Sequence, residues 1–311
     1  MKTKNVTVIG AGMMGNALAQ VFASNPGLKV ILRTRTLKDD RYVPIEKNLD
    51  IMIARGAATE QEKKDIISRI TFVTDLKQAT QNADFIIECA PEEMETKQNL
   101  LAEIEGYCGV HTILATNTSV MSPTEISEKC QHKERVVGAH FWNPGHLIPL
   151  VEVVKSNYTS EEVMQETMEL LTACGKKPIY CKKDVPGFVA NRLQHALWRE
   201  AFYMVENGIA DAKTVDDACK YGPGLRWPVM GPMENSDVVS IQLSLNIHNY
   251  ILKYLADNHT PSKCLQEMLD RGDNGFKTGK GWQEWTPEQM EATNTGLREY
   301  LIDCIAKQKN A

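Results

Sequence analysis

The sequence predicts an α/β protein in which a mostly parallel, doubly wound sheet is followed by an all-helical C-terminal domain. Short β-branched runs alternate with helical stretches as far as residue 181, which is the pattern of parallel strands joined by crossover helices. A glycine-rich segment, GAGMMG at 10–15, separates the first strand from the first helix. After residue 187 almost no strand signal remains, and long helical stretches dominate.

The composition excludes several classes of protein. The 311 residues include 42% hydrophobic and 24% charged residues, and the net charge is −5, so no broad basic surface is expected for nucleic acid or an anionic membrane. Residues 1–9 lack the apolar stretch of a signal peptide, and no run reaches transmembrane length; we therefore expect a cytoplasmic protein. The eight cysteines form no CxxC pair, so no metal site is expected.

The first elements fit a βαβ unit, with a strand at 5–9, a helix at 13–24 and a strand at 29–32. Further strands are expected at 70–73, 84–89, 112–116, 135–141, 150–154 and 177–181. Further helices are expected at 43–56, 60–68, 92–106, 122–130 and 160–174. The last of these has a predicted capping box of Thr159 and Glu162 and a terminating Gly175. This alternation indicates a Rossmann-type domain.

A domain boundary is expected near residue 183, in the segment KKDVPG at 182–187. Residues 1–183 would form the Rossmann-type domain and residues 184–311 the helical domain. Helices are expected there at 188–207, 211–221, 235–257 and 286–307. The apolar positions of these helices exceed what one thin layer needs, as at Leu197, Trp198, Phe202 and Tyr203. We therefore expect a homodimer through the helical domain.

The glycine-rich segment predicts a dinucleotide site. Gly10 permits a tight turn, Gly12 lets the backbone approach a pyrophosphate, and Gly15 lets the helix pack closely on the strand. The pyrophosphate would then meet the unpaired amides at the helix N-terminus, at Met13 and Met14. The alternative is an ordinary glycine-rich turn, but its position after a strand and before a helix favours the dinucleotide.

The residues at the end of the second strand bear on whether the cofactor is NAD or NADP. An acidic residue there would bind the ribose 2′-hydroxyl of NAD, but the sequence reads LRTRT at 32–36, and the nearest acids are Asp39 and Asp40. Arg33 and Arg35 would pair with a 2′-phosphate and Thr34 would donate to it, which slightly favours NADP. Alternatively, the arginines are solvated and NAD is held by other contacts.

A histidine and a glutamate twelve residues apart form a candidate catalytic pair. His140 ends one predicted strand and Glu152 lies within the next, so adjacent strands would bring them together. Such a histidine takes a hydroxyl proton while hydride leaves for a nicotinamide. A carboxylate partner orients the ring and stabilises the imidazolium. The alternative is a structural histidine at a strand end.

Eight segments in order resemble the 3-hydroxyacyl-CoA dehydrogenase family. They are VIGAGMMG at 8–15, ECAPEEMETK at 88–97, ATNTS at 115–119, GAHFWNP at 138–144, PLVEVV at 149–154, VPGFVANRL at 185–193, GPM at 231–233 and GFKTGKGW at 275–282. Because they span most of the chain, the sequence is identified as a member of this family. The expected fold is a nucleotide-binding domain with a helical second domain.

The resemblance implies a set of catalytic residues. His140 resembles the family's general base, Glu152 its partner carboxylate, and Ser119 the serine that hydrogen-bonds the substrate oxygen. Asn191 resembles the asparagine that contacts substrate from the second domain, in a cleft between the domains. One base, one orienting acid and two neutral donors form a coherent set for a developing carbonyl. Without the resemblance, Ser119 would be interpreted as a helix cap and Asn191 as a local helix-opening residue.

The resemblance also implies contacts to the cofactor. Glu92 and Lys97, within the segment at 88–97, resemble residues near the nicotinamide side. Asn117, from the NTS run, is expected to bind the cofactor too. The family uses NAD, so the cofactor stays open between NAD and NADP.

The substrate is less certain because one segment departs from the acyl-CoA pattern. GPGLRWPVMGPME at 222–234 contains a Leu-Arg-Trp insertion, which resembles the branch of L-gulonate 3-dehydrogenase and carnitine dehydrogenase; a pyridine-ring alcohol dehydrogenase is another similar relative. A small 3-hydroxy acid needs a cation for its carboxylate, and Arg226 is the first candidate. His146 and Arg192 are weaker ones. Arg226 stacked on Trp227 in a structural role is the alternative.

Two further functions compete with oxidation of a small 3-hydroxy acid to a 3-oxo acid, or its reverse. One is a 3-hydroxyacyl-CoA dehydrogenase acting on a substrate such as 3-hydroxybutyryl-CoA, which the helical pair after the second strand permits. The other is a non-catalytic dinucleotide-binding or redox-sensing protein. The intact set of Ser119, His140, Glu152 and Asn191 favours the enzyme, because binding alone does not need all four.

Overall fold

The computed structural model describes residues 2–309, and its chain divides into two compact units. One unit takes in Met1–Arg192 and Thr295–Ala311, and the other Leu193–Asn294. Residues 184–192 and the described residues from 295 onward thus group with the sheet-containing part, whereas the sequence analysis placed a domain boundary near residue 183. Among the described residues, no helix is both long and apolar enough to cross a membrane.

The first unit contains an eight-stranded sheet in the order β3-β2-β1-β4-β5-β6-β7-β8. All neighbouring strands are parallel except β6 and β7, which are antiparallel. The strands are β1 (Asn5–Ile9), β2 (Lys29–Arg33), β3 (Ile70–Val73), β4 (Phe85–Glu88), β5 (Ile113–Thr116), β6 (Val136–Phe141), β7 (Leu150–Val154) and β8 (Lys177–Cys181). The predicted mostly parallel, doubly wound sheet is confirmed, and each predicted strand lies within one residue of its observed bounds.

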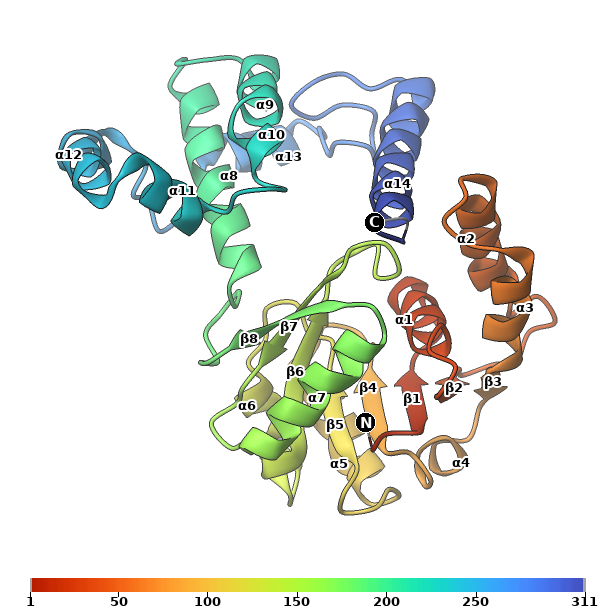
Figure 1. Ribbon diagram of the computed structural model, residues 1–311. Helices are drawn as coiled ribbons and strands as arrows, with labels where there is room; N and C mark the ends of the chain where they lie inside the picture. Colours follow the sequence, from red (N-terminus) through yellow and green to blue (C-terminus); the bar gives the residue numbers. More distant parts are fainter. Residues whose placement is uncertain (1, 310–311) are drawn as a thin grey trace. The chain divides into compact units, whose positions relative to one another are not determined.

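Helices cover both faces of this sheet because its strands are apolar on both sides. On one face, α1 (Met13–Ala23), α2 (Val43–Ala54), α3 (Glu60–Ser68) and α7 (Glu161–Ala173) share a core with the strands. On the other face, Leu101 and Ile104 of α5 (Met94–Glu105) and Ile126 of α6 (Pro123–Ile126) pack on residues of β1, β4, β5 and β6. Figure 1 shows α1 and α7 lying along the same side of the strands.

Three local features differ from the sequence prediction, and side-chain caps account for two of them. Ser160, not Thr159, caps α7 by accepting from the amide of Val163, and the Thr159 hydroxyl donates to the Val136 carbonyl. A short helix without a predicted counterpart, α4 (Leu76–Thr80), begins at the Asp75 cap. The predicted helix at 122–130 consists of α6 and a 3₁₀ turn at Ser127–Lys129.

The last helix, α14 (Pro287–Lys309), returns to the first unit over its C-terminal part. Ile302 is buried with Met52, Ala57 and Leu147. Arg55 at the end of α2 holds α14 by hydrogen bonds of 3.0 and 2.7 Å to the two carboxylate oxygens of Asp303. Sequence periodicity predicts the helix but gives no sign of this return.

The second unit is built from helices in the part that the structure describes. They are α8 (Ala190–Glu206), which begins in the first unit, α9 (Ala212–Tyr221), α10 (Pro223–Arg226), α11 (Pro232–Val239), α12 (Ile241–Ile251) and α13 (Lys263–Asp270). The helix predicted at 235–257 is broken at Ser240, whose φ is +85° and whose side chain caps α12. Helix α13 was not predicted.

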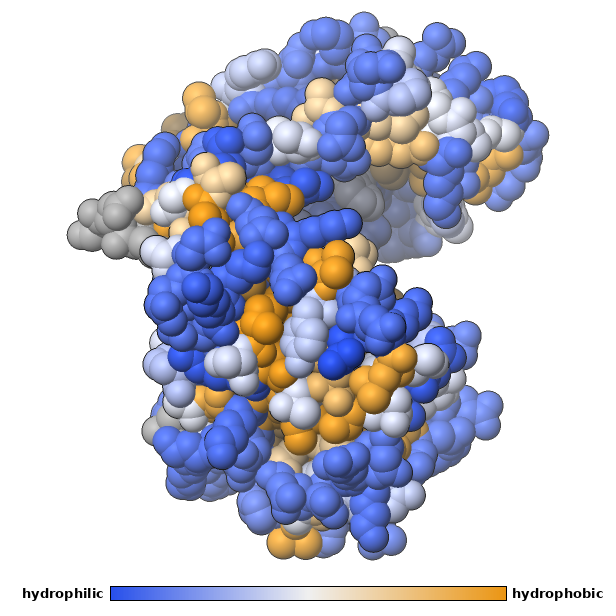
Figure 2. All heavy atoms as spheres, turned by 90° about the vertical axis from the view of Figure 1, so that its right-hand side faces the viewer, coloured by the Kyte–Doolittle hydropathy of each residue, from blue (hydrophilic) through white to orange (hydrophobic). Residues whose placement is uncertain are grey.

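Hydrophobic side chains are unusually exposed on α12. Ile241, Leu243, Leu245, Ile247 and Tyr250 are between 47% and 69% exposed. On the face of the molecule drawn in Figure 2, hydrophilic residues dominate and hydrophobic ones are visible between them. Exposed apolar residues in one helix are typical of a surface that another protein covers.

Candidate functional site

The candidate site lies at the carboxyl edge of the parallel strands. There β1 leads into Gly10, β4 into the segment containing Glu92, and β5 into Asn117, while His140 lies near the end of β6. Ligands of open parallel sheets bind at this edge, where the crossover direction changes. The topology therefore brings together predicted residues that are up to 130 positions apart in sequence.

The glycine loop has the shape that a pyrophosphate needs. Gly10 has φ +104°, and a Cβ atom on Gly15 would lie 1.6 Å from the carbonyl oxygen of Gly10. A Cβ atom on Gly12 would meet nothing within 4 Å, so Gly12 leaves open space beside α1. No side chain caps α1 and no acid lies in its first turn, which leaves the positive end of the helix free for an anion.

A pocket of about 980 Å³ opens beside this loop. Gly10, Gly12 and Asn16 line it, and the Asn16 amide ties the loop by donating to the carbonyls of Ala11 and Gly12, each at 2.9 Å. The other Asn16 amide atom, Oδ1, is buried without a partner. A dinucleotide fits this cradle, and Asn16 is a contributor that the sequence analysis missed. Predicted Met13 and Met14 do not line the pocket: Met13 is exposed and Met14 packs on the core.

Basic residues line the same pocket at the end of β2. Arg33, Arg35, Lys38 and Arg41 lie there with one acid, Asp40. Arg33 Nε donates to the Thr74 carbonyl at 3.1 Å, which fixes the side chain beside the pocket. The predicted donor Thr34 also lines the pocket, but its hydroxyl donates to the Thr36 carbonyl at 3.1 Å.

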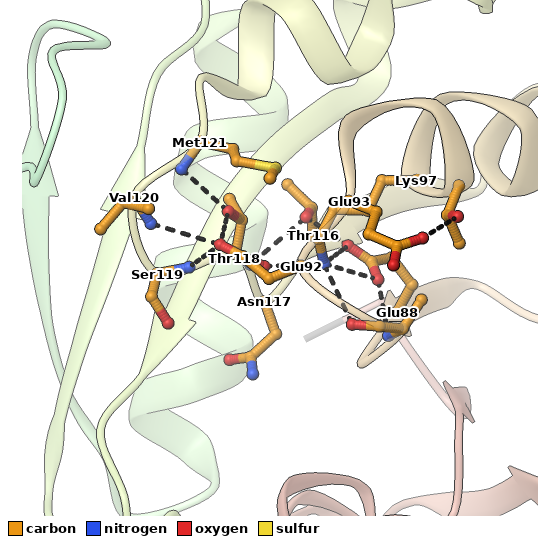
Figure 3. A network of polar contacts seen from close by, with 12 residues as sticks. Glu88, Glu92, Glu93, Lys97, Thr116, Asn117, Thr118, Ser119, Val120 and Met121 are labelled. Carbon is orange, nitrogen blue, oxygen red and sulfur yellow. Dashed lines mark hydrogen bonds and ion pairs between the residues drawn. The ribbon is translucent and has the colours of Figure 1, made fainter. Parts of the chain in front are cut away.

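A buried ion-pair network follows β4 (Figure 3). Lys97 is 1% exposed and its Nζ lies 2.9 Å from Glu88 Oε1 and 3.3 Å from Glu92 Oε2. The Thr116 hydroxyl donates to Glu88 as well. The Lys97 ammonium is therefore paired with carboxylates of the protein itself. Glu88 was missed in the sequence, although an acid ending the apolar run FIIE was a signal for a buried pair.

Glu92 links this network to Ser119. Its Oε1 accepts from the Thr118 hydroxyl, and from the Ser119 amide at 2.9 Å. Burial alone would raise the pKa of Glu92, but hydrogen bonds from Thr118 and Ser119 and the charge of Lys97 outweigh it and lower the pKa. The Glu92 carboxylate thus stays charged and fixes the turn that carries Ser119. Ser119 itself is exposed.

His140 and Glu152 meet as predicted. They are direct partners in the antiparallel β6–β7 register, and His140 Nδ1 lies 2.8 Å from Glu152 Oε2. Glu152 is fully buried, and Trp142 Nε1 donates to the same oxygen at 3.1 Å. Its other oxygen, Oε1, accepts from the amides of Val189 and Ala190 at 2.9 and 2.8 Å. Trp142 and these two amides were not foreseen.

These four donors keep Glu152 ionised. Desolvation by itself would raise its pKa, but the hydrogen bonds from His140, Ala190, Val189 and Trp142 together lower it. A carboxylate at Oε2 requires a proton on His140 Nδ1, so Nε2 is the nitrogen left to accept a proton. The geometry therefore suits a general base.

Of the remaining predicted residues, Asn191 and Asn117 make hydrogen bonds at the candidate site, and Arg226 lies in the second unit. Asn191 Nδ2 donates to the Ser119 carbonyl at 3.0 Å, and Asn117 Oδ1 accepts from the Phe141 amide at 2.9 Å. Asn117 thus joins the ends of β5 and β6. Arg226 is exposed on α10 of the second unit. The cation–π contacts of the described residues do not include an Arg226–Trp227 pair.

Known proteins share this architecture. The family model described as the NAD binding domain of 3-hydroxyacyl-CoA dehydrogenase matches residues 5–185, and the model of its C-terminal domain matches residues 187–285. An L-carnitine dehydrogenase of Bacillus cereus is 38% identical over 237 residues, which are 74% of this chain and 69% of that protein. A probable 3-hydroxybutyryl-CoA dehydrogenase of Bacillus subtilis is 34% identical over 290 residues, which are 92% and 98%.

A solved structure agrees with these matches. The crystal structure of 5-formyl-3-hydroxy-2-methylpyridine 4-carboxylic acid 5-dehydrogenase, described as an NAD⁺-dependent dismutase, superposes with a TM-score of 0.86 at 29% identity. The match covers 97% of each chain.

Replacing Trp142 by Phe should weaken the hold on Glu152. The change removes one of the donors that lower the Glu152 pKa, so the pKa should rise. A carboxylate with a lowered pKa stabilises the fold above its unfolded pKa, and this contribution is lost as pH falls through the folded pKa. We expect the free energy of unfolding at pH 7 to fall by about 1–2 kcal/mol, and the acid-induced loss to begin at higher pH in the variant.

Urea unfolding between pH 3 and 7 measures both effects. Trp198→Phe, at a half-exposed tryptophan of α8, is the matched control and should keep the wild-type pH dependence. Identical pH dependence of Trp142→Phe and wild type would contradict the role given to the indole.

Proposed function

This chain belongs to the 3-hydroxyacyl-CoA dehydrogenase family, and from that premise we propose that it interconverts the 3-hydroxy and 3-oxo forms of a small acid with His140 as general base. The hydrogen-bonded pair of His140 and Glu152 carries this proposal, because it leaves His140 Nε2 free to take a proton at the edge where the glycine loop lies. NAD, when held by the pocket beside the glycine loop, would supply the hydride acceptor, or the hydride donor in the reverse direction.

The protein's own groups would divide the remaining work. His140 takes the hydroxyl proton, and the buried carboxylate of Glu152 stabilises the imidazolium. The Ser119 hydroxyl and the Asn191 amide donate to the substrate oxygen as it becomes a carbonyl oxygen. One Asn191 N–H is already given to the Ser119 carbonyl, so the second N–H is the one available. Glu92 keeps this turn in place through the Ser119 amide.

His140→Ala should abolish turnover while NADH binding persists. Loss of a positioned general base costs about 10²–10⁴-fold in rate, and His140 does not line the dinucleotide pocket. The measurement combines absorbance at 340 nm with NADH fluorescence titration. The matched control is His132→Ala, since His132 is half-exposed and pairs only with Glu134 in the salt bridges of the described residues. Native turnover in His140→Ala would end the proposal.

The substrate class that we propose is a free 3-hydroxy acid. The similarity to L-carnitine dehydrogenase and to a dehydrogenase of a pyridine carboxylic acid supports it. Arg226 remains the proposed carboxylate contact, because it makes no salt bridge to another described residue. The similarity to a probable 3-hydroxybutyryl-CoA dehydrogenase favours the alternative, a CoA ester.

Arg226→Ala should raise KM for an acid substrate about tenfold, because a lost charge-assisted hydrogen bond is worth about 1.5–3 kcal/mol. Steady-state assays with carnitine, gulonate and 3-hydroxybutyrate identify the acid, and 3-hydroxybutyryl-CoA tests the alternative. The methyl ester of the preferred acid is the matched control, since its KM should be the same in wild type and variant. An unchanged KM for the acid would exclude Arg226 as its partner.

We further propose that the protein accepts NADP alongside NAD, with a slight preference for NADP. The family match and the NAD⁺-dependent structural relative support NAD. The four basic residues with one acid at the end of β2 support NADP, because guanidinium groups suit a 2′-phosphate.

Replacing Arg33 and Arg35 together by Ala should lower kcat/KM for NADP at least tenfold, corresponding to about 1.4 kcal/mol or more. The value for NAD should change by less than about threefold, because a 2′-hydroxyl carries no charge to pair with. Assays with both coenzymes at one ionic strength make NAD the internal control. Equal losses for the two coenzymes would contradict a role in 2′-phosphate binding.

We also propose a cytoplasmic homodimer that associates through the helical unit. The exposed apolar side chains of α12 support this association. We likewise propose that the two folding units divide at residue 183.

A further inference from the structure

A second pocket lies in the first unit, apart from the carboxyl-edge site. Its volume is about 710 Å³, and its walls come from α1, α2, α3, the loop before β7, the segment before β8 and α14. None of its lining residues lines the dinucleotide pocket, and none belongs to the His140–Glu152 pair or the Glu92 network. Pockets of this size hold small organic ligands.

Two polar atoms in the lining have no hydrogen-bond partner. They are Gln20 Oε1 and His146 Nδ1, both buried. Gln20 is only 3% exposed, and its Nε2 contacts Met52 Sδ at 3.5 Å. Buried polar atoms are almost always paired, and an unpaired one costs about 1–3 kcal/mol. Both residues line the one pocket, so a single polar occupant can lie beside both side chains.

A buried cation lies in the same wall. Lys176 is 8% exposed, and its Nζ donates to the carbonyls of Gly145 and Ile148 at 2.6 and 2.9 Å. It has no carboxylate partner among the described residues. Burial lowers the pKa of Lys176 to about 8. Burial, then Lys176 and Arg298, lower the pKa of His146 to about 4, so His146 is neutral beside the ammonium.

The other charged residues of the lining belong to α3 and its end. Asp65 accepts from Gln61, Arg69 donates to the Ala23 carbonyl, and Glu62 takes part in the cap of α3. They are already engaged within the protein. Lys176 is therefore the buried charge that lacks an opposite partner, and with two of its three N–H groups used, one remains for a monoanion.

Another part of the pocket lining is apolar. Leu301 and Ile305 of α14 line the pocket together with Met52 and Leu147, and these residues form one small hydrophobic cluster. An occupant with a short apolar body would bury its carbons against this cluster. It would also connect α14 to α1.

We propose that this pocket is a second, non-catalytic site for a small carboxylic acid with a hydroxyl or amino group at its far end. The carboxylate would lie beside Lys176 Nζ and His146, the far donor would reach Gln20 Oε1, and the carbon chain would pack on Met52, Leu301 and Ile305. Because the ligand binds only the folded chain, it stabilises α14 against the sheet domain. The proposal does not rest on the proposed reaction.

Isothermal titration of the full chain with 6-hydroxyhexanoate tests the site, since this probe has the carboxylate, the chain and the far hydroxyl. Titration is done with saturating NAD and in His140→Ala as well, so that binding at the reaction site is separated. We expect one saturable site per chain under all these conditions. The neutral 6-hydroxyhexanamide should bind at least tenfold more weakly.

Two variants locate the binding. Gln20→Met keeps the shape but removes the unpaired acceptor, so binding should weaken about tenfold while the melting temperature does not fall. Ile305→Phe fills the pocket and should abolish binding. Lys133→Ala, at a partly exposed lysine that does not line the pocket, should bind as wild type.

A crystal soaked with the probe gives the direct test. Density for the probe between α1 and α14 supports the site. Waters alone on Gln20 Oε1 and His146 Nδ1, equal binding of acid and amide, or unchanged binding in both pocket variants would each overturn the proposal.

Discussion

The buried carboxylate of Glu152 is the constraint on which the candidate site depends. An isolated carboxylate in this position would be expelled or protonated, yet four donors converge on its two oxygens. Two of these donors are main-chain amides at the entry to α8, and one is the ring of His140. One side chain therefore sets the tautomer of the histidine and also fixes where the chain leaves the sheet. Asn191, one residue beyond those amides, is placed beside Ser119 by the same interaction.

In the Lys97 network on the neighbouring strands, buried charges are likewise stabilised by several hydrogen bonds. A lysine and a glutamate that are both buried lose much solvation, and their attraction rarely repays it unless further hydrogen bonds complete the group. Here Thr116 completes Glu88, while Thr118 and the Ser119 amide complete Glu92. The network thus fixes the Ser119 turn from one side, and Asn191 contacts the same turn from the other. Ser119 needs no buried contact of its own to be held in place.

The sequence predicted those parts that follow from regular periodicity. Pairing of His140 with Glu152 needed only adjacent strands and a short connection, and the register delivers it. Features set by single side chains escaped: the Ser160 cap, the break at Ser240 and the indole of Trp142 on Glu152. The return of α14 escaped for another reason, because a contact between Arg55 and Asp303 spans 248 positions and leaves no local pattern. Roles at the site came from motifs, since a lone serine or asparagine has no distinctive spacing.

The catalytic pair with its neighbouring ion-pair network differs from the pocket beside α14 in how the buried charges are satisfied. Around the His140–Glu152 pair and the Lys97 network, every buried charge has a partner within the protein, so the site is rigid before any ligand arrives. In the pocket beside α14, a glutamine oxygen and a histidine nitrogen are unpaired and an ammonium lacks a counter-charge. A fold tolerates such groups only where their cost is small against the total or where an occupant repays it. The first unit therefore combines a site whose buried charges are paired within the protein with a pocket whose lining contains unpaired polar groups.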